Sequence, residues 1–272
     1  MIISYKEAKR LLLGSKEISL DLGLTRTRVI FKDDKYFFPE NQTLTKQDLK
    51  KVIKKDKICF FIEENTIVPI SIFSEETNKY YKLVPTINWP TIELSGIRMH
   101  VTSSMAPKED TEKKISFVFP LQGNILDTCT GLGYTAIMAS RTADMVYTYE
   151  IDSNVIEIQK INPYSKELFN NPKIKRHNAN CFERIKDFKG CFFDAIIHDP
   201  PRLTLATTLY SQDFYNDLFK ILKSEGKLYH YTGDPGSKNR SMDIRSGISK
   251  RLEKSGFVNI KRVFNGLTAL KP

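Results

Sequence analysis

The chain has 272 residues, which is enough for one or two domains and too many for a miniature fold held together by disulfides or a metal. Its 40% hydrophobic and 27% charged residues are typical of a globular protein, and no apolar run approaches the roughly 20 residues of a membrane-spanning helix. The formal charge of +10 favours a polyanionic partner, although basic enzymes with small substrates are also common. We therefore expect a cytoplasmic protein without a signal peptide or membrane association.

The cysteines and histidines lack the spacing of a metal site. None of the four cysteines forms a C-x-x-C pair, and no two of the four histidines stand four residues apart. We expect reduced cysteines and no metal.

Residues 1–90 predict a small, mixed but β-rich N-terminal domain. Short runs of β-branched and aromatic residues recur over residues 5–86, with one lysine-rich helical segment at residues 45–55. No grouping of residues typical of catalysis occurs here, so we expect a role in packing or substrate positioning. Residues 91–110 connect this domain to the rest.

Residues 91–272 predict a doubly wound α/β domain. From residue 125 on, apolar strand segments alternate with helical segments, which is the pattern of a parallel sheet covered by helices on both faces. The last two strands are separated by Asn265-Gly266, the dipeptide that most favours a two-residue hairpin loop. We expect this antiparallel pair to close one edge of the sheet.

The clearest motif is ILDTCTGLGYTA, residues 125–136. A buried strand ends in Asp127, and Gly131 and Gly133 follow before a helix. Glycines allow a ligand to approach the backbone closely, and the helix start presents free N–H groups. Because Ala136 interrupts a full G-x-G-x-x-G pattern, ordinary strand-to-helix packing is the alternative.

The next strand ends in Glu150, 23 residues beyond Asp127. A carboxylate at this position can accept hydrogen bonds from both hydroxyls of a ribose. Asp152 is a second candidate, with the start of the following helix as its alternative role.

The third motif is FDAIIHDPPR, residues 193–202. Asp199 follows a buried strand, and Pro200 and Pro201 hold the chain extended behind it. Prolines have no N–H, so we expect the carbonyl oxygens of this turn to point outward as acceptors for an amine. A turn that only ends the strand is the alternative.

Together these motifs resemble those of class I S-adenosylmethionine-dependent methyltransferases, over roughly residues 125–272. The resemblance implies a Rossmann-like, seven-stranded sheet with an antiparallel last strand and S-adenosylmethionine as cofactor. It also implies that Asp127, Gly131 and Gly133 hold the methionine portion and Glu150 the ribose. Asn180 falls where many members place an Asp near the adenine amino group.

A narrower resemblance rests on GIRMH, HDPPR and YHYTGDPGSK, residues 96–100, 198–202 and 229–238. These segments look like those of an archaeal group of predicted methyltransferases described as spermidine-synthase-like. The group does not imply a particular substrate.

The acceptor is predicted from the double-proline motif. In the resembling amino-methyltransferases with D-P-P-Y, the acidic side chain and the adjoining carbonyl grip an N–H₂ group and the aromatic ring stacks on the base. Here Arg202 stands in the fourth place, where it can stack on a base or hold a phosphate. Tyr210 could supply a ring instead, or it could pack beneath the loop.

Basic residues concentrate in the last third of the chain. From Lys220 on, twelve Lys and Arg residues face four acidic ones. Lys238 and Arg240 follow a strand end and could contact phosphates, whereas Lys250, Arg251 and Lys254 fit a solvated helix face.

The histidines have no shared pattern. We expect His198 to face the core, whereas His230 could reach the carboxyl edge of the sheet and His100 could form one wall of the pocket.

We therefore expect a methyltransferase that acts on a nitrogen of an RNA base, with tRNA as the leading substrate and Asp199, Pro200, Pro201 and Arg202 at the acceptor. One alternative is methyl or aminopropyl transfer to a small amine or polyamine, although an aminopropyltransferase needs an acidic groove and usually a G-G-G loop. Another is an RNA-binding protein that has lost catalysis.

Overall fold

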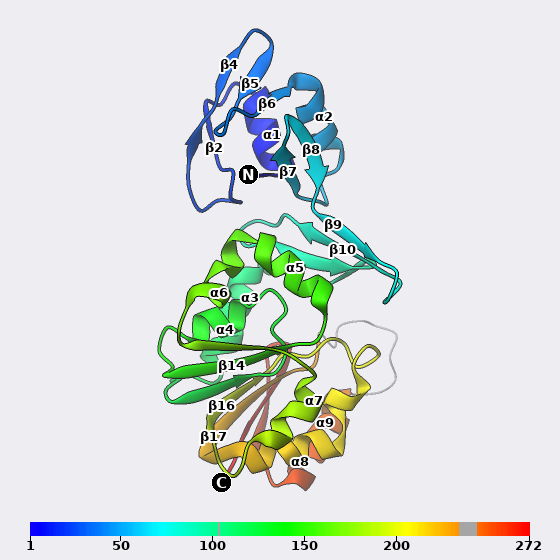
Figure 1. The fold of residues 1–272 in the computed structure, drawn as a ribbon. Coiled ribbons are helices and arrows are strands. Elements are labelled where there is room, and N and C mark those ends of the chain that lie inside the picture. Colours follow the sequence, from blue (N-terminus) through cyan, green and yellow to red (C-terminus); the bar gives the residue numbers. More distant parts are fainter. Residues whose placement is uncertain (103, 234–243) are drawn as a thin grey trace. The chain divides into compact units, whose positions relative to one another are not determined.

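The fold is that of a computed structural model, which describes residues 1–102, 104–233 and 244–272 (Figure 1). Two units make up the chain. The N-terminal unit comprises Met1–Lys108 and Glu157–Tyr164, and the C-terminal unit comprises Glu109–Ile156 and Ser165–Pro272.

Over Met1–Lys108 the N-terminal unit consists of small antiparallel sheets and the helices α1 and α2. Its elements are β1 (Ile2–Ile3), α1 (Tyr5–Leu12), β2 (Glu17–Ile18), β3 (Thr27–Arg28), β4 (Ile30–Lys32), β5 (Lys35–Phe37), β6 (Thr43–Thr45), α2 (Lys46–Lys54), β7 (Phe60–Glu63), β8 (Thr66–Pro69), β9 (Ser71–Ser74), β10 (Lys79–Val84), β11 (Thr91–Leu94) and β12 (Ile97–Arg98). The predicted small β-rich part is thus confirmed as a set of small antiparallel sheets.

The two helices of this unit pack their apolar faces into one core. Helix α2 is the predicted lysine-rich segment, and it begins with a capping box in which Thr45 and Asp48 each accept a hydrogen bond from the other's backbone N–H. Helix α1 is a second helix within residues 5–86, where only residues 45–55 were expected to be helical, so the prediction missed it. Ala8 and Leu11 form its buried stripe at helical spacing, between charged residues.

The C-terminal unit is a seven-stranded α/β sheet. From residue 107 on, the elements are α3 (Pro107–Ser116), β13 (Asn124–Asp127), α4 (Tyr134–Ala139), β14 (Met145–Glu150), α5 (Ser153–Ile161), η1 (Pro163–Ser165), α6 (Lys166–Asn170), β15 (Ile174–Asn178), α7 (Cys181–Arg184), η2 (Ile185–Asp187), β16 (Phe193–His198), η3 (Thr207–Tyr210), α8 (Gln212–Ile221), β17 (Leu222–Tyr231), α9 (Ile244–Ser255), β18 (Val258–Val263) and β19 (Gly266–Leu270).

The strand order is β15-β14-β13-β16-β17-β19-β18. The first five strands are parallel, β19 runs antiparallel to both of its neighbours, and β18 therefore has the direction of the first five. This confirms the predicted sheet and its antiparallel hairpin. The loop differs by one residue from the prediction: Val263 pairs with Gly266, so the loop consists of Phe264 and Asn265. Asn265 takes the left-handed conformation, with φ 52°.

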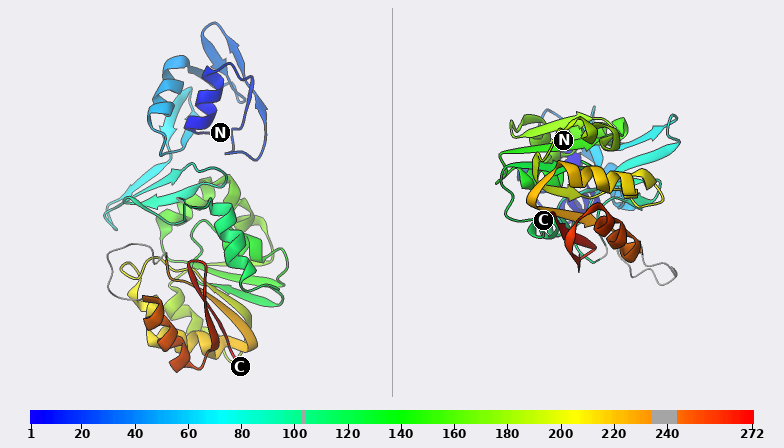
Figure 2. Two further views of the ribbon diagram at one scale, coloured as in Figure 1. Left: turned by 180° about the vertical axis from the view of Figure 1, so that it is seen from behind. Right: turned by 90° about the horizontal axis from the view of Figure 1, so that it is seen from below.

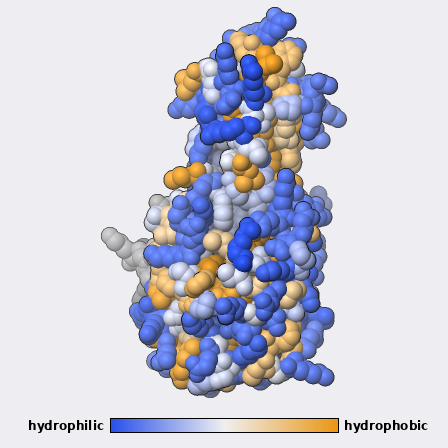
Figure 3. Space-filling model, turned by 90° about the vertical axis from the view of Figure 1, so that its left-hand side faces the viewer, coloured by the Kyte–Doolittle hydropathy of each residue, from blue (hydrophilic) through white to orange (hydrophobic). Residues whose placement is uncertain are grey.

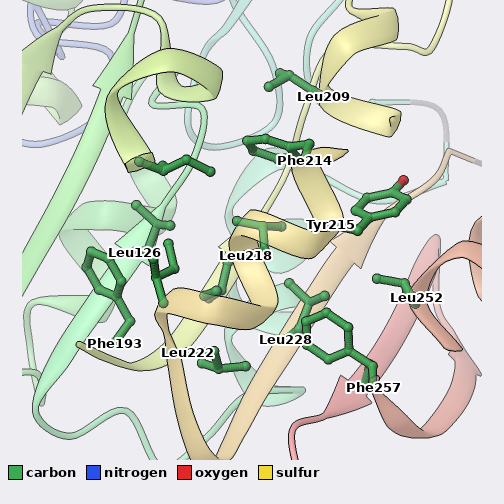
Figure 4. Close-up of a cluster of buried hydrophobic side chains, with 14 of the residues drawn as sticks. Leu126, Phe193, Leu209, Phe214, Tyr215, Leu218, Leu222, Leu228, Leu252 and Phe257 are labelled. Atoms are coloured by element: carbon green, nitrogen blue, oxygen red, sulfur yellow. The ribbon is translucent and has the colours of Figure 1, made fainter. Parts of the chain in front are cut away.

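Helices cover both faces of this sheet and enclose two separate cores (Figures 1 and 2). Leu126, Ile196 and Leu228 point into the core beneath α8 and α9, part of which Figure 4 shows. Their strand neighbours point to the other core, which includes residues of α3, α4 and α6. Two buried faces explain why these strands are almost continuously apolar.

Parallel strands bring their carboxyl ends to one edge of the sheet. Strand β13 ends at Asp127, β14 at Glu150 and β16 at His198, directly before Asp199. Because β13 pairs with both β14 and β16, the three motifs of the sequence analysis lie at the ends of three neighbouring strands. This is the edge at which open α/β sheets bind ligands.

Candidate active site at the carboxyl edge of the sheet

Asp127 organises the glycine turn from within the protein. Its carboxylate is fully buried and accepts hydrogen bonds from Thr135 Oγ1 at 3.1 Å and Thr148 Oγ1 at 2.7 Å. Burial raises the pKa of Asp127 to about 7, although these two hydrogen bonds favour the ionised form. In this geometry Asp127 joins β13, α4 and β14 at the start of the turn.

The two glycines of the turn have different surroundings. Both have positive φ, 53° at Gly131 and 82° at Gly133. A Cβ on Gly131 would meet no heavy atom within 4 Å, whereas a Cβ on Gly133 would lie 2.2 Å from Leu168 Cδ1. Gly131 therefore leaves space beside the backbone, and Gly133 allows α4 and α6 to pack closely.

Exchanging each glycine for alanine should separate these roles. Gly133→Ala should lower the free energy of unfolding by roughly 2–4 kcal/mol, because it combines a left-handed backbone with a clash. Gly131→Ala should cost only about 1 kcal/mol, the backbone penalty alone. Urea denaturation of the two variants measures the difference, and equal losses would contradict the assignment.

Glu150 holds the glycine turn from the neighbouring strand. Its Oε2 accepts a hydrogen bond from Gly131 N–H and its Oε1 accepts one from Asp152 N–H, both at 3.0 Å. Burial raises the pKa of Glu150 to about 7, with these backbone donors opposing the shift. Each carboxylate oxygen has a further lone pair, so hydroxyl donors of a ligand can still bind.

Asp152 and Asn180 both act at the start of a helix. Asp152 Oδ1 accepts hydrogen bonds from the backbone N–H and the side-chain amide of Asn154, at 3.0 and 3.2 Å. Asn180 Oδ1 accepts one from Phe182 N–H at 3.0 Å and caps α7. This supports the capping alternative for Asp152, and the amide oxygen of Asn180 is used within the protein.

The double-proline turn differs from its prediction at one carbonyl. Pro200 is buried, Arg202 is exposed, and Pro201 O accepts a hydrogen bond from Tyr210 Oη at 2.8 Å. The expected outward-facing carbonyl is therefore occupied. Tyr210 is 4% exposed and packs beneath the loop, so it does not offer its ring as a stacking surface.

Asp199 is part of a buried charge cluster that the sequence analysis missed. Lys114 Nζ donates to Asp199 Oδ2 at 2.7 Å and lies 2.8 Å from Asp110 Oδ2. The side chains of Lys114 and Asp110 are 3% and 0% exposed, whereas that of Asp199 is 20% exposed. We call these three residues the Lys114 triad.

The members of the triad compensate one another's charges. Burial disfavours the ammonium of Lys114, but the carboxylates of Asp199 and Asp110 outweigh burial and raise its pKa above the usual value. Burial also raises the pKa of Asp110, against the attraction of Lys114. The Lys114 ammonium lies 4.8 Å from the centre of the Tyr231 ring, at the end of β17.

Neither His198 nor His230 is exposed at the carboxyl edge of the sheet. His198 and His230 are fully buried, with ring centroids 4.3 Å apart, and burial lowers the pKa of each. His198 faces the core as predicted, and His230 bonds to Tyr215 Oη at 2.9 Å, which contradicts the expectation that it reaches the edge. His100 belongs to the N-terminal unit, where its Nδ1 lies 2.9 Å from Thr91 Oγ1.

Only some of the basic residues singled out in the last third of the chain lie within the described residues. Lys238 and Arg240 lie outside the described residues. Lys250 and Lys254 are exposed on α9, as a solvated helix face requires.

Within the described part of the chain, no group of three His, Cys, Asp or Glu side chains could hold a metal ion, and no helix is long and apolar enough to span a membrane.

Part of the chain matches a family model, and nearly all of it is similar to a known protein. Residues 131–261 match the model of the spermine/spermidine synthase domain. The chain is 45% identical over 280 residues to the uncharacterized protein MJ1233 of Methanocaldococcus jannaschii, covering 99% of this chain and 95% of that protein.

Two solved structures share the fold at low identity. A spermidine synthase in complex with the transition-state analogue AdoDATO has a TM-score of 0.60 and 19% identity, over 76% of this chain and 77% of that one. MNMC2 from Aquifex aeolicus has a TM-score of 0.52 and 16% identity, over 71% of each chain. These likenesses show the fold alone, so the activity has to be inferred from the geometry of the site.

Proposed function

We propose that this chain, which belongs to the same family as MJ1233 of Methanocaldococcus jannaschii, transfers a methyl group from S-adenosylmethionine to a nitrogen of an RNA base. The observation that carries the proposal is that the neighbouring strands β13, β14 and β16 end at or directly before Asp127, Glu150 and Asp199, with Gly131 in the turn after β13. This edge offers a place for a nucleotide donor beside a carboxylate for the acceptor.

The residues at the edge fit a donor of this class. The open space beside Gly131 lets a ligand approach the backbone, and Glu150 can accept hydrogen bonds from ribose hydroxyls. We assign the methionine portion to Asp127, Gly131 and Gly133, with Asp127 supporting the turn, and the adenine to the neighbourhood of Asn180. When bound, the sulfonium supplies an already activated methyl group.

Donor binding should depend on pH through Glu150. Its pKa of about 7 in the free protein means that it is partly protonated at neutral pH, whereas ribose hydroxyls favour the ionised carboxylate. Affinity for S-adenosylhomocysteine should therefore rise several-fold from pH 6 to pH 8, within the limit of about tenfold per pH unit for one proton. Calorimetry at both values measures this.

Glu150→Gln is the control for that dependence, since the amide does not titrate. The variant should bind more weakly and with a flatter pH profile. Tighter wild-type binding at pH 6 than at pH 8 would contradict the assignment of Glu150.

Asp199 is suited to orient the acceptor. Lys114 occupies its Oδ2, so the carboxylate is held in one orientation while 20% of the side chain stays exposed. As the nitrogen attacks the methyl carbon, positive charge builds on nitrogen, and a carboxylate that accepts its N–H stabilises that charge. The remaining requirement is alignment, which the double-proline turn serves by fixing the backbone beside Asp199.

Positive charge on the protein supports an RNA acceptor. The formal charge is +10. Hydrophilic residues, which Figure 3 does not separate by charge, predominate on the face that it shows. In the N-terminal unit, Arg10, Lys16 and Arg28 line a shallow, open hollow of about 490 Å³ together with Ser15 and Glu17. Three cations around such a hollow can bind the phosphates of a nucleic acid.

A second candidate is aminopropyl transfer to a small amine. The match to the spermine/spermidine synthase domain and the fold of the spermidine synthase favour it. A third is an RNA-binding protein without catalysis, which would need neither the space beside Gly131 nor the exposed part of the Asp199 carboxylate. Methyl transfer and aminopropyl transfer are both compatible with this fold, so an assay must separate them.

The assay compares two donors and two acceptors with the purified protein. Methyl-labelled S-adenosylmethionine is offered with unmodified tRNA transcripts, and decarboxylated S-adenosylmethionine is offered with putrescine or spermidine. We expect label in the RNA, at a base nitrogen identified by nucleoside mass spectrometry. Aminopropyl transfer to the amine without RNA methylation would establish the second candidate instead.

A further inference from the structure

We propose that Lys114 determines acceptor specificity by cancelling the charge of Asp199, so that the site takes an uncharged nitrogen and rejects polycationic amines. This inference rests on the proposed function in placing the acceptor at Asp199. Lys114, on which the inference depends, belongs to α3, and this helix lies outside all three sequence motifs.

The geometry makes Lys114 a dedicated partner of Asp199. Asp110 and Lys114 stand four residues apart on α3, so both project from one face of the helix. Asp110 is fully buried behind the ammonium, and Asp199 reaches it from the end of β16, 85 residues away. The ammonium therefore links the helix to the carboxyl edge of the sheet.

Charge balance at this place disfavours a polyamine. Lys114 lies between Asp110 and Asp199, so the partly exposed carboxylate of Asp199 is already paired with a cation, and the exposed Arg202, three residues further on, adds a positive charge to this edge. A polyamine carries at least two positive charges and needs carboxylates that are not already neutralised. A neutral base nitrogen requires only one hydrogen-bond acceptor, and repulsion does not oppose it.

The same ion pair positions the carboxylate. Lys114 binds Oδ2, whereas Oδ1 of Asp199 has no hydrogen-bond partner among the described residues. Oδ1 is thus available for an N–H of the acceptor. Lys114 acts through Asp199 and is a positioning residue.

The test removes Lys114 together with Asp110, because a lone substitution would leave Asp110 buried without a partner. Asp110→Asn/Lys114→Met keeps the total charge and frees Asp199. Lys114→Arg keeps the cation, and Lys113→Met is the matched control, since Lys113 is exposed on the same helix and lies over the Phe264 ring. Thermal denaturation shows which variants fold.

The probe is spermidine, whose affinity is measured by calorimetry with and without S-adenosylhomocysteine. Compared with wild type, the double variant should bind spermidine about tenfold more tightly, because the cation in contact with the partly exposed Asp199 is gone, whereas the negative charge lost with it, on Asp110, is fully buried behind that cation. Lys114→Arg and Lys113→Met should bind as wild type does. Equal affinity in the double variant and wild type would overturn the proposal.

Methyl transfer to tRNA transcripts gives an independent readout. In the double variant kcat should fall at least tenfold with an unchanged KM for S-adenosylmethionine, and Lys114→Arg should retain most of the rate. An unchanged kcat would show that Lys114 has only a structural role. If wild type transfers no methyl group, the proposed function fails, while the spermidine comparison still decides whether Lys114 excludes polycations.

Discussion

Replacing Asp199 with alanine is expected to lower methyl transfer to RNA by about 10²–10³-fold, the usual effect of removing one transition-state hydrogen-bonding group. The variant loses the carboxylate that accepts the acceptor's N–H, but it keeps Lys114 paired with Asp110 at 2.8 Å. The buried ammonium therefore remains compensated and the fold should persist. Initial rates with labelled S-adenosylmethionine at saturating RNA measure the loss.

Asp187→Ala is the matched control for this experiment. Asp187 is an exposed carboxylate of the same unit that pairs with Arg184 at 3.2 Å, so its loss should leave the rate unchanged. Both variants should bind S-adenosylhomocysteine as wild type does. A rate within a few-fold of wild type in Asp199→Ala would remove Asp199 from the chemistry.

The second large effect is on stability. Lys114→Met should lower the free energy of unfolding by about 3–5 kcal/mol, because it leaves the fully buried Asp110 without its cation. Urea denaturation measures this change. Restoring the balance with Asp110→Asn/Lys114→Met should recover most of it, and a double variant as unstable as the single one would contradict this explanation.

The pH dependence of that loss follows from Asp110. Burial raises its pKa in the folded protein, so the folded state holds the proton more tightly than the unfolded chain does. Its contribution to stability is present below the unfolded pKa and is lost as pH rises. Without Lys114 the carboxylate has lost its main compensating charge, so Lys114→Met should be more destabilised at pH 8 than at pH 5. A loss that is the same at both values would show that Asp110 does not cause it.

The parts of the site that sequence could predict are those determined by local signals. Asp127, Glu150 and Asp199 each end or directly follow an apolar strand, and strand-helix alternation places such positions at one edge of a parallel sheet. Asn265 likewise predicted the hairpin. These inferences needed only the neighbouring residues.

The missed features depend on distant parts of the chain. Asp110 and Lys114 lie among other charged residues, where a pair four residues apart normally indicates an exposed helix face. This pair is buried because Asp199 and the sheet cover it, and the sequence around residues 107–116 contains no sign of those distant residues. The occupied Pro201 carbonyl has a similar cause, since Tyr210 reaches it from beyond the loop.

The most direct test of the whole account is a crystal structure of the protein with S-adenosylhomocysteine. The ligand should lie along Gly131, its ribose hydroxyls on the Glu150 carboxylate and its sulfur facing the Asp199 side of the edge. A ligand bound elsewhere, or with its sulfur directed away from Asp199, would contradict the proposed chemistry.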